Sequence, residues 1–254
     1  MNTTAIGWTD FSANPLKYRD ASGAVKWACA KVSPGCTNCY SEALAKRWNR
    51  GADYNAGEVA KLTPFLDEKE LRSMLTSKKI SGKRVFVGDM TDIFGEWVAD
   101  DLLDRLFAGF ADRPDVTWQV LTKRAERMRD FLSDGQRKPS RWPSVHLGVS
   151  VENNERAIER IPLLAATPAA IRFISAEPLL GSINLSDQIG NLDWVIVGGE
   201  SGPRFRSCEV ADITDIVQQC RRASVPVFVK QDAHRLPGQQ GRIPDNYFVQ
   251  EFPQ

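Results

Sequence analysis

Three cysteines, Cys29, Cys36 and Cys39, fall within eleven residues and give the spacing C-x6-C-x2-C. Thiolates are common protein ligands of zinc and of iron–sulfur clusters. A structural zinc site needs four closed ligands, whereas three thiolates hold a four-iron, four-sulfur cluster and leave one iron open. The spacing therefore predicts a [4Fe–4S] cluster whose open iron binds a further ligand and supports chemistry.

A structural zinc ion is the alternative interpretation of the same cysteines. Cys36 and Cys39 would form a knuckle and Cys29 would be the third ligand, with His146, His234 or a remote cysteine as the fourth. The two remaining cysteines lie near and within a predicted helix, where cysteine is usually a small buried hydrophobic residue, and we leave them out of the cluster: Cys208 and Cys220.

The composition sets limits on the class of protein. A chain of 254 residues with 42% hydrophobic side chains is long enough for one large domain with a substantial core. The formal net charge is +1, so any surface that binds nucleic acid must be a local patch. No apolar stretch approaches the roughly 20 residues of a membrane span, and the N-terminus does not resemble a signal peptide. We expect a cytoplasmic protein without membrane contact.

Six short runs rich in β-branched residues predict strands, and each run ends in glycine or polar residues. These runs cover 84–88, 117–122, 145–151, 171–176, 193–199 and 225–230. The stretch 6–15 supplies a candidate first strand. Short apolar runs of this kind are typical of strands that are buried on both faces.

Helical patterns, with apolar residues three and four apart, lie between these strands and are clearest at 98–112, 155–166 and 209–223. Such alternation predicts a parallel sheet with covering helices. Six or seven strands are fewer than the eight of a closed barrel. We therefore expect an α/β fold, a partial (βα)6-type TIM barrel, in a single domain over 1–254 with 235–254 as a terminal extension.

The predicted strands end in polar side chains, and the carboxyl ends of parallel barrel strands converge on one pocket. The residues that follow or end successive strands include Gly88, Asp89, Met90, Lys123, Ser150, Glu152, Glu177, Glu200 and Lys230. The cysteines follow the candidate first strand and precede a predicted helix that opens at Cys39. A helix N-terminus favours thiolate or cluster charge. We expect the cysteines and the strand ends to share one pocket.

A three-cysteine loop after the first strand of a partial barrel resembles the radical S-adenosylmethionine superfamily, whose commonest spacing is C-x3-C-x2-C. The first gap is longer here, and Asn38 replaces the usual aromatic residue, although Tyr40 follows directly. The chain is most similar to a phage-associated family of three-cysteine, radical-SAM-like proteins. The motifs that carry this resemblance are WTDFSANP, VSPGCTNCYSEALAKRW, VFVGDMTDIF, VLTKRAERM, LGVSVEN, ISAEPLLG and WVIVGGESG.

The resemblance implies a cofactor and a mechanism. S-adenosylmethionine would chelate the open iron through its amino and carboxylate groups, and an electron from the cluster would cleave it to a 5′-deoxyadenosyl radical that abstracts hydrogen from the substrate. A reductant such as flavodoxin or ferredoxin would supply the electron. For a phage-encoded protein, the location would be the host cytoplasm.

The resemblance also assigns roles by strand order. Residues 88–90 (Gly88, Asp89 and Met90) would contact the methionine amino group and Lys123 its carboxylate. Ser150 and Glu152 would meet the ribose hydroxyls, and backbone near Glu177 would frame the adenine. On the substrate side, the expected residues are Glu200, which would face the substrate, and Lys230, which would donate a proton or bind a carboxylate. The alternative for Lys230 is an ion pair with Glu177 or Glu200.

Basic residues interleaved with aromatics bind phosphates and stack bases, although many such runs are solvated surfaces. Arg204 and Arg206 flank Phe205, and other basic residues occur at 123–129 and 137–141. The leading hypothesis is an enzyme that modifies or rearranges a nucleobase substituent, with DNA as one candidate substrate and Arg204 and Arg206 near the phosphates. The alternatives are a radical enzyme for a small amino-acid-like metabolite and a zinc-stabilised nucleic-acid-binding protein without catalysis.

Overall fold

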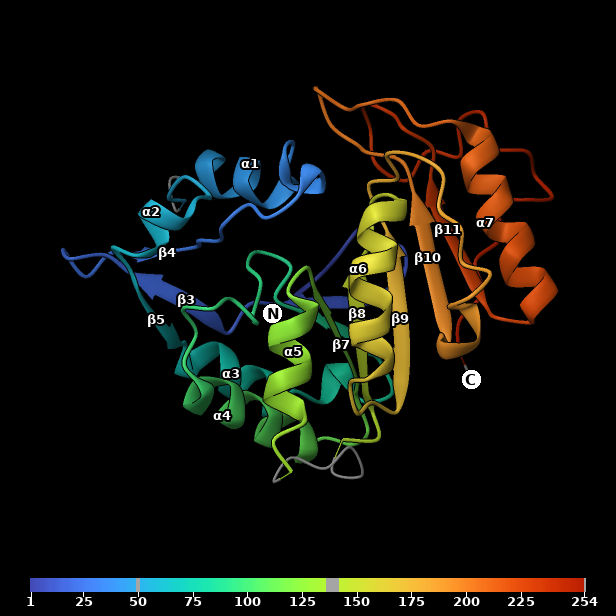
Figure 1. Ribbon diagram of the computed structural model, residues 1–254. Helices are drawn as coiled ribbons and strands as arrows, with labels where there is room; N and C mark the ends of the chain where they lie inside the picture. The colour runs from blue at the N-terminus through green and yellow to red at the C-terminus, as the bar shows by residue number, and fades with distance from the viewer. Residues whose placement is uncertain (49–50, 136–141, 254) are drawn as a thin grey trace.

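A computed structural model describes residues 1–48, 51–135 and 142–253 and shows a mixed α/β domain around a large, curled parallel sheet (Figure 1). The strand order is β1-β2-β6-β7-β8-β9-β10-β11, parallel throughout except for β1 at one edge. The strands are β1 (Asn2–Thr3), β2 (Phe11–Ala13), β6 (Arg84–Val87), β7 (Thr117–Thr122), β8 (Val145–Ser150), β9 (Ile171–Ala176), β10 (Trp194–Gly198) and β11 (Val227–Gln231). All six predicted strands are confirmed, and the candidate first strand shortens to β2.

Helices pack on the outer face of this sheet (Figure 1). They are α3 (Glu68–Thr76), α4 (Asp100–Ala111), α5 (Ala125–Leu132), α6 (Asn154–Ala165) and α7 (Val210–Ala223). The helices predicted at 98–112, 155–166 and 209–223 are confirmed as α4, α6 and α7. Their apolar side chains meet valines and isoleucines from the outer face of the strands. The stretch 235–246 contains no helix or strand, as its glycines and prolines predict.

A second, smaller sheet lies beside the first and was not predicted. It is antiparallel in the order β4 (Val25–Lys26), β3 (Leu16–Arg19) and β5 (Thr63–Leu66). The short helices α1 (Tyr40–Arg47) and α2 (Ala56–Val59) belong to the same part of the chain (Figure 1). This unit carries the three cysteines to the carboxyl edge of the large sheet.

The inner face of the curled sheet is filled by aromatic side chains. Phe86, Phe173, Trp194 and Phe228 come from four strands, and Trp8 from the N-terminal segment packs among them. The ring centroids of Trp8 and Trp194 are 6.3 Å apart with edge-on geometry, which suits the charge distribution of aromatic rings. Burying one such ring contributes about 1.5–3 kcal/mol. These side chains close the interior beneath the carboxyl edge.

Further along the same strands, the inner positions become small or polar. Two residues beyond Phe173 is Ser175, and two residues beyond Phe228 is Lys230. Side chains alternate between faces along a strand, so these residues point to the same side as the aromatic rings. Ser150 on β8 also lines the resulting space. The change from bulky rings to small and polar groups opens a cavity at the carboxyl edge.

Candidate functional site

The cavity has a volume of about 220 Å³ and lies where the strands of the large sheet end. Its wall contains all three cysteines of the C-x6-C-x2-C motif, together with residues from six strand ends. The predicted site residues that line it are Gly88, Asp89, Met90, Lys123, Ser150, Glu177, Glu200 and Lys230. The expectation of a shared pocket is met for these residues, whereas Glu152, Arg204 and Arg206 lie outside the lining.

The three cysteines line the same cavity as the strand ends. Within residues 1–48, 51–135 and 142–253, no group of three or more His, Cys, Asp or Glu side chains is arranged to hold a metal ion.

We call residues 29–39 the cysteine loop. Its centre is a single 3-10 turn over Pro34–Cys36, in which the Cys36 N–H donates to the Ser33 carbonyl over 2.9 Å. Cys39 is the N-cap of α1, so the predicted helix opening at this residue is confirmed. The positive end of the α1 dipole therefore adjoins the Cys39 thiol. Burial raises the pKa of Cys29 to about 12, with Asp92 acting in the same direction.

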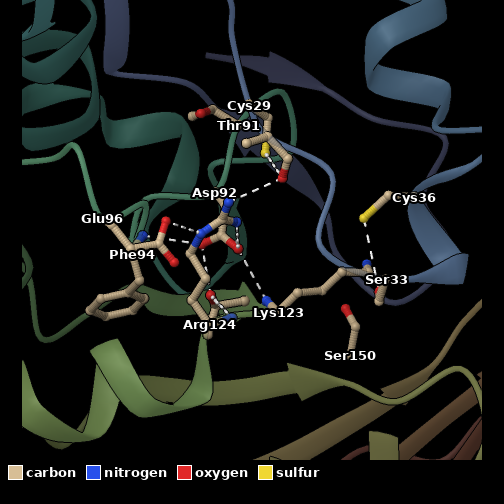
Figure 2. Close-up of polar contacts among 12 residues, drawn as sticks. Cys29, Ser33, Cys36, Thr91, Asp92, Phe94, Glu96, Lys123, Arg124 and Ser150 are labelled. Atoms are coloured by element: carbon tan, nitrogen blue, oxygen red, sulfur yellow. Dashed lines mark hydrogen bonds and ion pairs between the residues drawn. The ribbon is translucent and has the colours of Figure 1, made fainter. Parts of the chain in front are cut away.

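A buried ion pair holds the first part of the cysteine loop (Figure 2). Arg124 Nη1 lies 3.0 Å from the Asp92 carboxylate, and Arg124 Nη2 donates to the Ala30 carbonyl over 3.0 Å. The Thr122 hydroxyl also donates to Asp92, over 2.7 Å. Arg124 and Asp92 are both buried, and Arg124 also pairs with Glu96 over 2.8 Å, so the charge of Asp92 depends on Arg124 for compensation. The ends of β6 and β7 thus fix the backbone next to Cys29.

A second buried ion pair holds the middle of the loop. The Glu152 carboxylate accepts the Gly35 N–H over 3.0 Å and pairs with Arg160 over 3.1 Å. Burial alone would raise the pKa of Glu152, but hydrogen bonds from Ser33 and Gly35 and the charge of Arg160 lower it. Glu152, expected at a ribose, therefore lies fully buried beneath the loop instead of in the cavity wall.

A third pair holds the last part of the loop. The Arg206 backbone N–H and Nε donate to Glu200 over 2.8 and 3.0 Å, and Arg206 Nη1 donates to the Pro34 carbonyl over 3.0 Å. Asn38 Nδ2 donates to the same carboxylate over 2.9 Å. Burial would raise the pKa of Glu200, but Arg206 and Asn38 lower it. Glu200, expected as a free carboxylate facing substrate, and Arg206, expected at phosphates, are bonded to each other and to the loop.

The end of β6 forms a tight turn that presents Asp89 to the cavity. Gly88 has φ +89°, and a Cβ there would lie 2.8 Å from Ile93, so only glycine fits without displacement. Asn14 Nδ2 donates to the Asp89 carboxylate over 2.5 Å. Burial raises the pKa of Asp89. In the described ranges Asp89 has no ion-pair partner, which leaves a half-buried carboxyl that favours a cationic ligand.

α1 contacts the backbone of the same turn. The Ser41 hydroxyl donates to the Asp89 carbonyl over 2.6 Å and the Tyr40 hydroxyl over 3.1 Å. The Tyr54 hydroxyl donates to the Met90 carbonyl over 2.7 Å. The Met90 side chain is buried against Tyr54 and Ala45. The turn that follows β6 is therefore fixed to the helix that follows the cysteines.

On the opposite wall, Lys230 Nζ lies 3.0 Å from Glu177 Oε1. The other carboxylate oxygen of Glu177 accepts Trp8 Nε1 over 3.3 Å and the Ser175 hydroxyl over 3.2 Å. Of the two carboxylates considered as ion-pair partners of Lys230, Glu177 is the one that pairs with it. Lys123 also lines the cavity, and among the placed residues its ammonium group has no hydrogen bond or ion pair.

Five further residues considered from the sequence lie outside the cavity lining. Arg204 is exposed beyond the cavity, and its carbonyl accepts Asn38 Nδ2 over 2.7 Å. Cys208 and Cys220 are buried away from the cavity, as predicted. Burial lowers the pKa of His146 to about 4, and His234 lies in the loop after β11. Of the basic residues at 137–141, Arg137, Lys138 and Arg141 lie outside the described residues.

Sequence reasoning missed the residues that support the site from a distance. Asn14 and Trp8 are in the candidate first strand, but nothing in their neighbourhood marks them as partners of Asp89 and Glu177. Arg160 sits within a helix pattern, where arginine usually faces water, and its partner is eight residues earlier in the chain. Asp92 and Arg124, by contrast, follow predicted strands, and this position alone predicts that they lie at the cavity, where both are found.

Comparison with known proteins gives one family. The family model described as "Protein of unknown function (DUF5131)" matches residues 3–252. No curated protein matches the chain. None of the helices in the described part of the chain is long and apolar enough to span a bilayer.

Proposed function

The chain belongs to the DUF5131 family. From the geometry of its cavity and from the resemblance carried by its cysteine motif, we propose that it is a radical S-adenosylmethionine enzyme. Cys29, Cys36 and Cys39 would hold a [4Fe–4S] cluster, and the substrate would be a nucleobase substituent, with DNA as one candidate. The main observation in support of this proposal is that the three thiols of the cysteine loop line one cavity, and that three arginine–carboxylate pairs fix this loop.

The three pairs support a cofactor site more than a structural one. They contact the loop backbone at Ala30, Pro34 and Gly35 and the side chain of Asn38, so the loop is held from the ends of β6, β7, β8 and β10. Ligands held in place before binding avoid the entropy cost of ordering them when a group binds. A loop whose only task was to cover the sheet would not need buried charge, because a buried ion pair adds little net stability.

The cavity wall has groups for the charges of the proposed cofactor. A reduced cluster held by the three cysteines would supply one electron for cleavage of S-adenosylmethionine to methionine and a 5′-deoxyadenosyl radical. Asp89 offers a carboxyl for the methionine ammonium, and Lys123 a free ammonium for its carboxylate. Ser150 offers a hydroxyl within the same cavity. Trp8 and Phe86 are apolar parts of the wall that exclude water from the reacting groups.

The Lys230–Glu177 pair is the proposed substrate end of the cavity. It lies on strands remote in sheet order from the turn that holds Asp89, and it combines one donor and one acceptor 3.0 Å apart. A lysine held this way can give a proton to the substrate or bind its anionic group. We also propose that the curled sheet is a (βα)6-type partial barrel, since its mouth holds these residues as the mouths of closed barrels do.

Metal and sulfide analysis of anaerobically reconstituted protein tests the proposal. We expect about four irons and four sulfides per chain and a brown protein, both lost in a Cys29→Ala, Cys36→Ala, Cys39→Ala variant. The matched control is Cys208→Ala, Cys220→Ala, which removes two buried cysteines outside the cavity. One zinc without sulfide would contradict the proposal and favour the zinc-stabilised binding protein.

Cofactor cleavage then tests the reaction. With dithionite and S-adenosylmethionine, the loaded protein should release 5′-deoxyadenosine, and release should rise with an oligonucleotide or nucleoside substrate. Turnover with free amino-acid-like metabolites, without a response to nucleic acid, would instead favour the metabolite enzyme. A loaded protein that never releases 5′-deoxyadenosine would exclude both radical mechanisms.

A further inference from the structure

Two loops on the rim of the cavity are joined to each other. The His234 N–H, after β11, donates to the Glu200 carbonyl over 3.1 Å, and the Gly202 N–H, after β10, donates to the His234 carbonyl over 3.2 Å. Glu200 and Ser201 line the cavity, so this junction starts at the cavity wall. A ligand bound on the joined loops would therefore lie next to the mouth of the cavity.

The joined loops carry an exposed aromatic pair. The rings of Phe205 and His234 are nearly parallel, at 27°, with centroids 6.5 Å apart. Phe205 is 39% exposed although it is a large apolar side chain, and Leu236 beside His234 is 58% exposed. His234 accepts the Leu236 N–H at Nδ1 over 3.0 Å, which fixes the orientation of its ring. Flat rings held at a rim offer a surface for stacking.

Free cations flank this pair. Arg204 and Arg235 are exposed neighbours of Phe205 and His234 in the chain, and in the described ranges neither side chain has a hydrogen bond or ion pair. Arg206, by contrast, is bonded to Glu200 and Pro34. We call Phe205, His234, Arg204 and Arg235 the rim platform. Its cationic character is local, since the net charge of the whole chain is only +1.

We propose that the rim platform binds single-stranded or locally unpaired nucleic acid, with a base stacked on Phe205 and His234 and phosphates at Arg204 and Arg235. This inference rests on the proposed function, because it specifies how a nucleobase substrate would approach the cavity. Aromatic rings beside unpaired arginines match the two repeating features of a single strand, its bases and its phosphates. Bases that are paired in a duplex do not expose their faces for stacking.

Fluorescence polarisation with a labelled mixed-sequence oligonucleotide tests the rim platform, using the full chain with and without reconstituted cluster. We expect Phe205→Ala to weaken single-strand binding at least fivefold, as expected for the loss of one stacked base. Phe205→Trp should retain or strengthen binding. Arg204→Gln and Arg235→Gln should each weaken binding and reduce its salt dependence by about 0.7 in the log–log slope.

Matched controls are Ile158→Ala, which removes an exposed hydrophobic residue of α6, and Arg222→Gln, which removes an exposed cation of α7. Both should leave binding unchanged. Absence of single-strand binding, equal losses in the controls, or tighter binding of the duplex with no effect of Phe205→Ala would overturn the inference. Those results leave cluster content and 5′-deoxyadenosine release untouched, so they are distinguishable from a failure of the proposed function.

Discussion

The backbone N–H of Gly35 donates to the Glu152 carboxylate over 3.0 Å, across 117 residues of sequence. Glu152 is fully buried, and its other oxygen pairs with Arg160 over 3.1 Å. The contact places a buried negative charge directly behind the turn that separates Cys29 from Cys36. The position of the cysteines therefore depends on a strand end that does not itself face the cavity.

Substitution of Gly35 tests this contact directly. A Cβ at position 35 would lie 3.1 Å from the Glu152 carboxyl carbon, which is buried and held at both oxygens. We expect Gly35→Ala to destabilise the fold by about 1–3 kcal/mol, as overpacking does in other proteins. Urea unfolding measures the change, and Gly190→Ala, with open space around its Cβ, is the control. An unchanged free energy of unfolding would show that the loop moves aside without cost.

Removal of the Glu152 side chain should be more damaging than removal of its charge. Glu152→Ala leaves Arg160 buried without compensation, and we expect a loss of about 3–5 kcal/mol. Glu152→Gln keeps the acceptor for the Gly35 N–H, so it should lose less stability and retain more bound iron. Urea unfolding and iron analysis of both variants provide the comparison. Equal stability of the two variants would contradict the role assigned to the Gly35 contact.

The third ion pair should limit access to the thiols of the cysteine loop. Arg206→Lys keeps the charge but loses the paired hydrogen bonds to Glu200 and the bond to Pro34. If this loss raises the free energy of the closed loop by about 1 kcal/mol, alkylation of Cys36 in the metal-free protein should accelerate about fivefold. Mass spectrometry of labelled peptides measures the rate, with Arg222→Lys as the control. An unchanged alkylation rate would contradict this role of Arg206 and show that the other two ion pairs are enough to keep the loop closed.

The half-buried carboxyl of Asp89 should govern cofactor affinity. Asp89→Asn preserves shape and can still bond to Asn14, but it cannot carry the charge that complements an ammonium group. We expect S-adenosylmethionine to bind at least tenfold more weakly, which corresponds to about 1.4 kcal/mol. Isothermal calorimetry measures the affinity, and Asp187→Asn on the surface is the control. Unchanged affinity would remove Asp89 from the proposed cofactor site.

Acid should destabilise the protein partly through Asp232. Its hydrogen bonds with Arg242 lower the pKa of Asp232 from 3.8 to about 2. A carboxyl whose pKa is lowered by folding stabilises the fold above its unfolded pKa, and this contribution is lost as the pH falls through the folded value. Asp232→Asn should therefore remove part of the stability difference between pH 4 and pH 2. Urea midpoints across this interval measure it, and identical curves for both proteins would contradict the assignment.

The large sheet could be predicted because its strands carry a strong local signal. The runs at 117–122 and 171–176 are rich in β-branched or aromatic residues and are followed by a charged residue, and both match strands of the structure. The small sheet could not be predicted. Its strands Leu16–Arg19 and Thr63–Leu66 span only four residues each, and they pair with each other although they are far apart in sequence. The second of them also contains Pro64, a residue that is rare inside strands.

The candidate site could be predicted as a set of strand ends but not as a set of contacts. Strand order places Glu152, Glu177 and Glu200 at one edge of the sheet, and that is where they are found. Their partners depend on how the chain turns after each strand. Glu152 lies beneath the cysteine loop, where it pairs with Arg160. Glu177 pairs with Lys230 and also accepts a hydrogen bond from Trp8. No local sequence pattern marks Arg160 or Trp8 as a partner of these carboxylates.

The three arginine–carboxylate pairs also bear on how the cysteine loop moves with time. The loop contains little regular secondary structure, and such segments usually exchange their amide hydrogens through small local openings. Here the Gly35 amide cannot open without breaking a hydrogen bond to a buried carboxylate at the end of β8. Its exchange should then be slower than that of a loop amide bonded only to water. In kinetic terms, each opening of this loop must also uncover a buried charge at the end of β8.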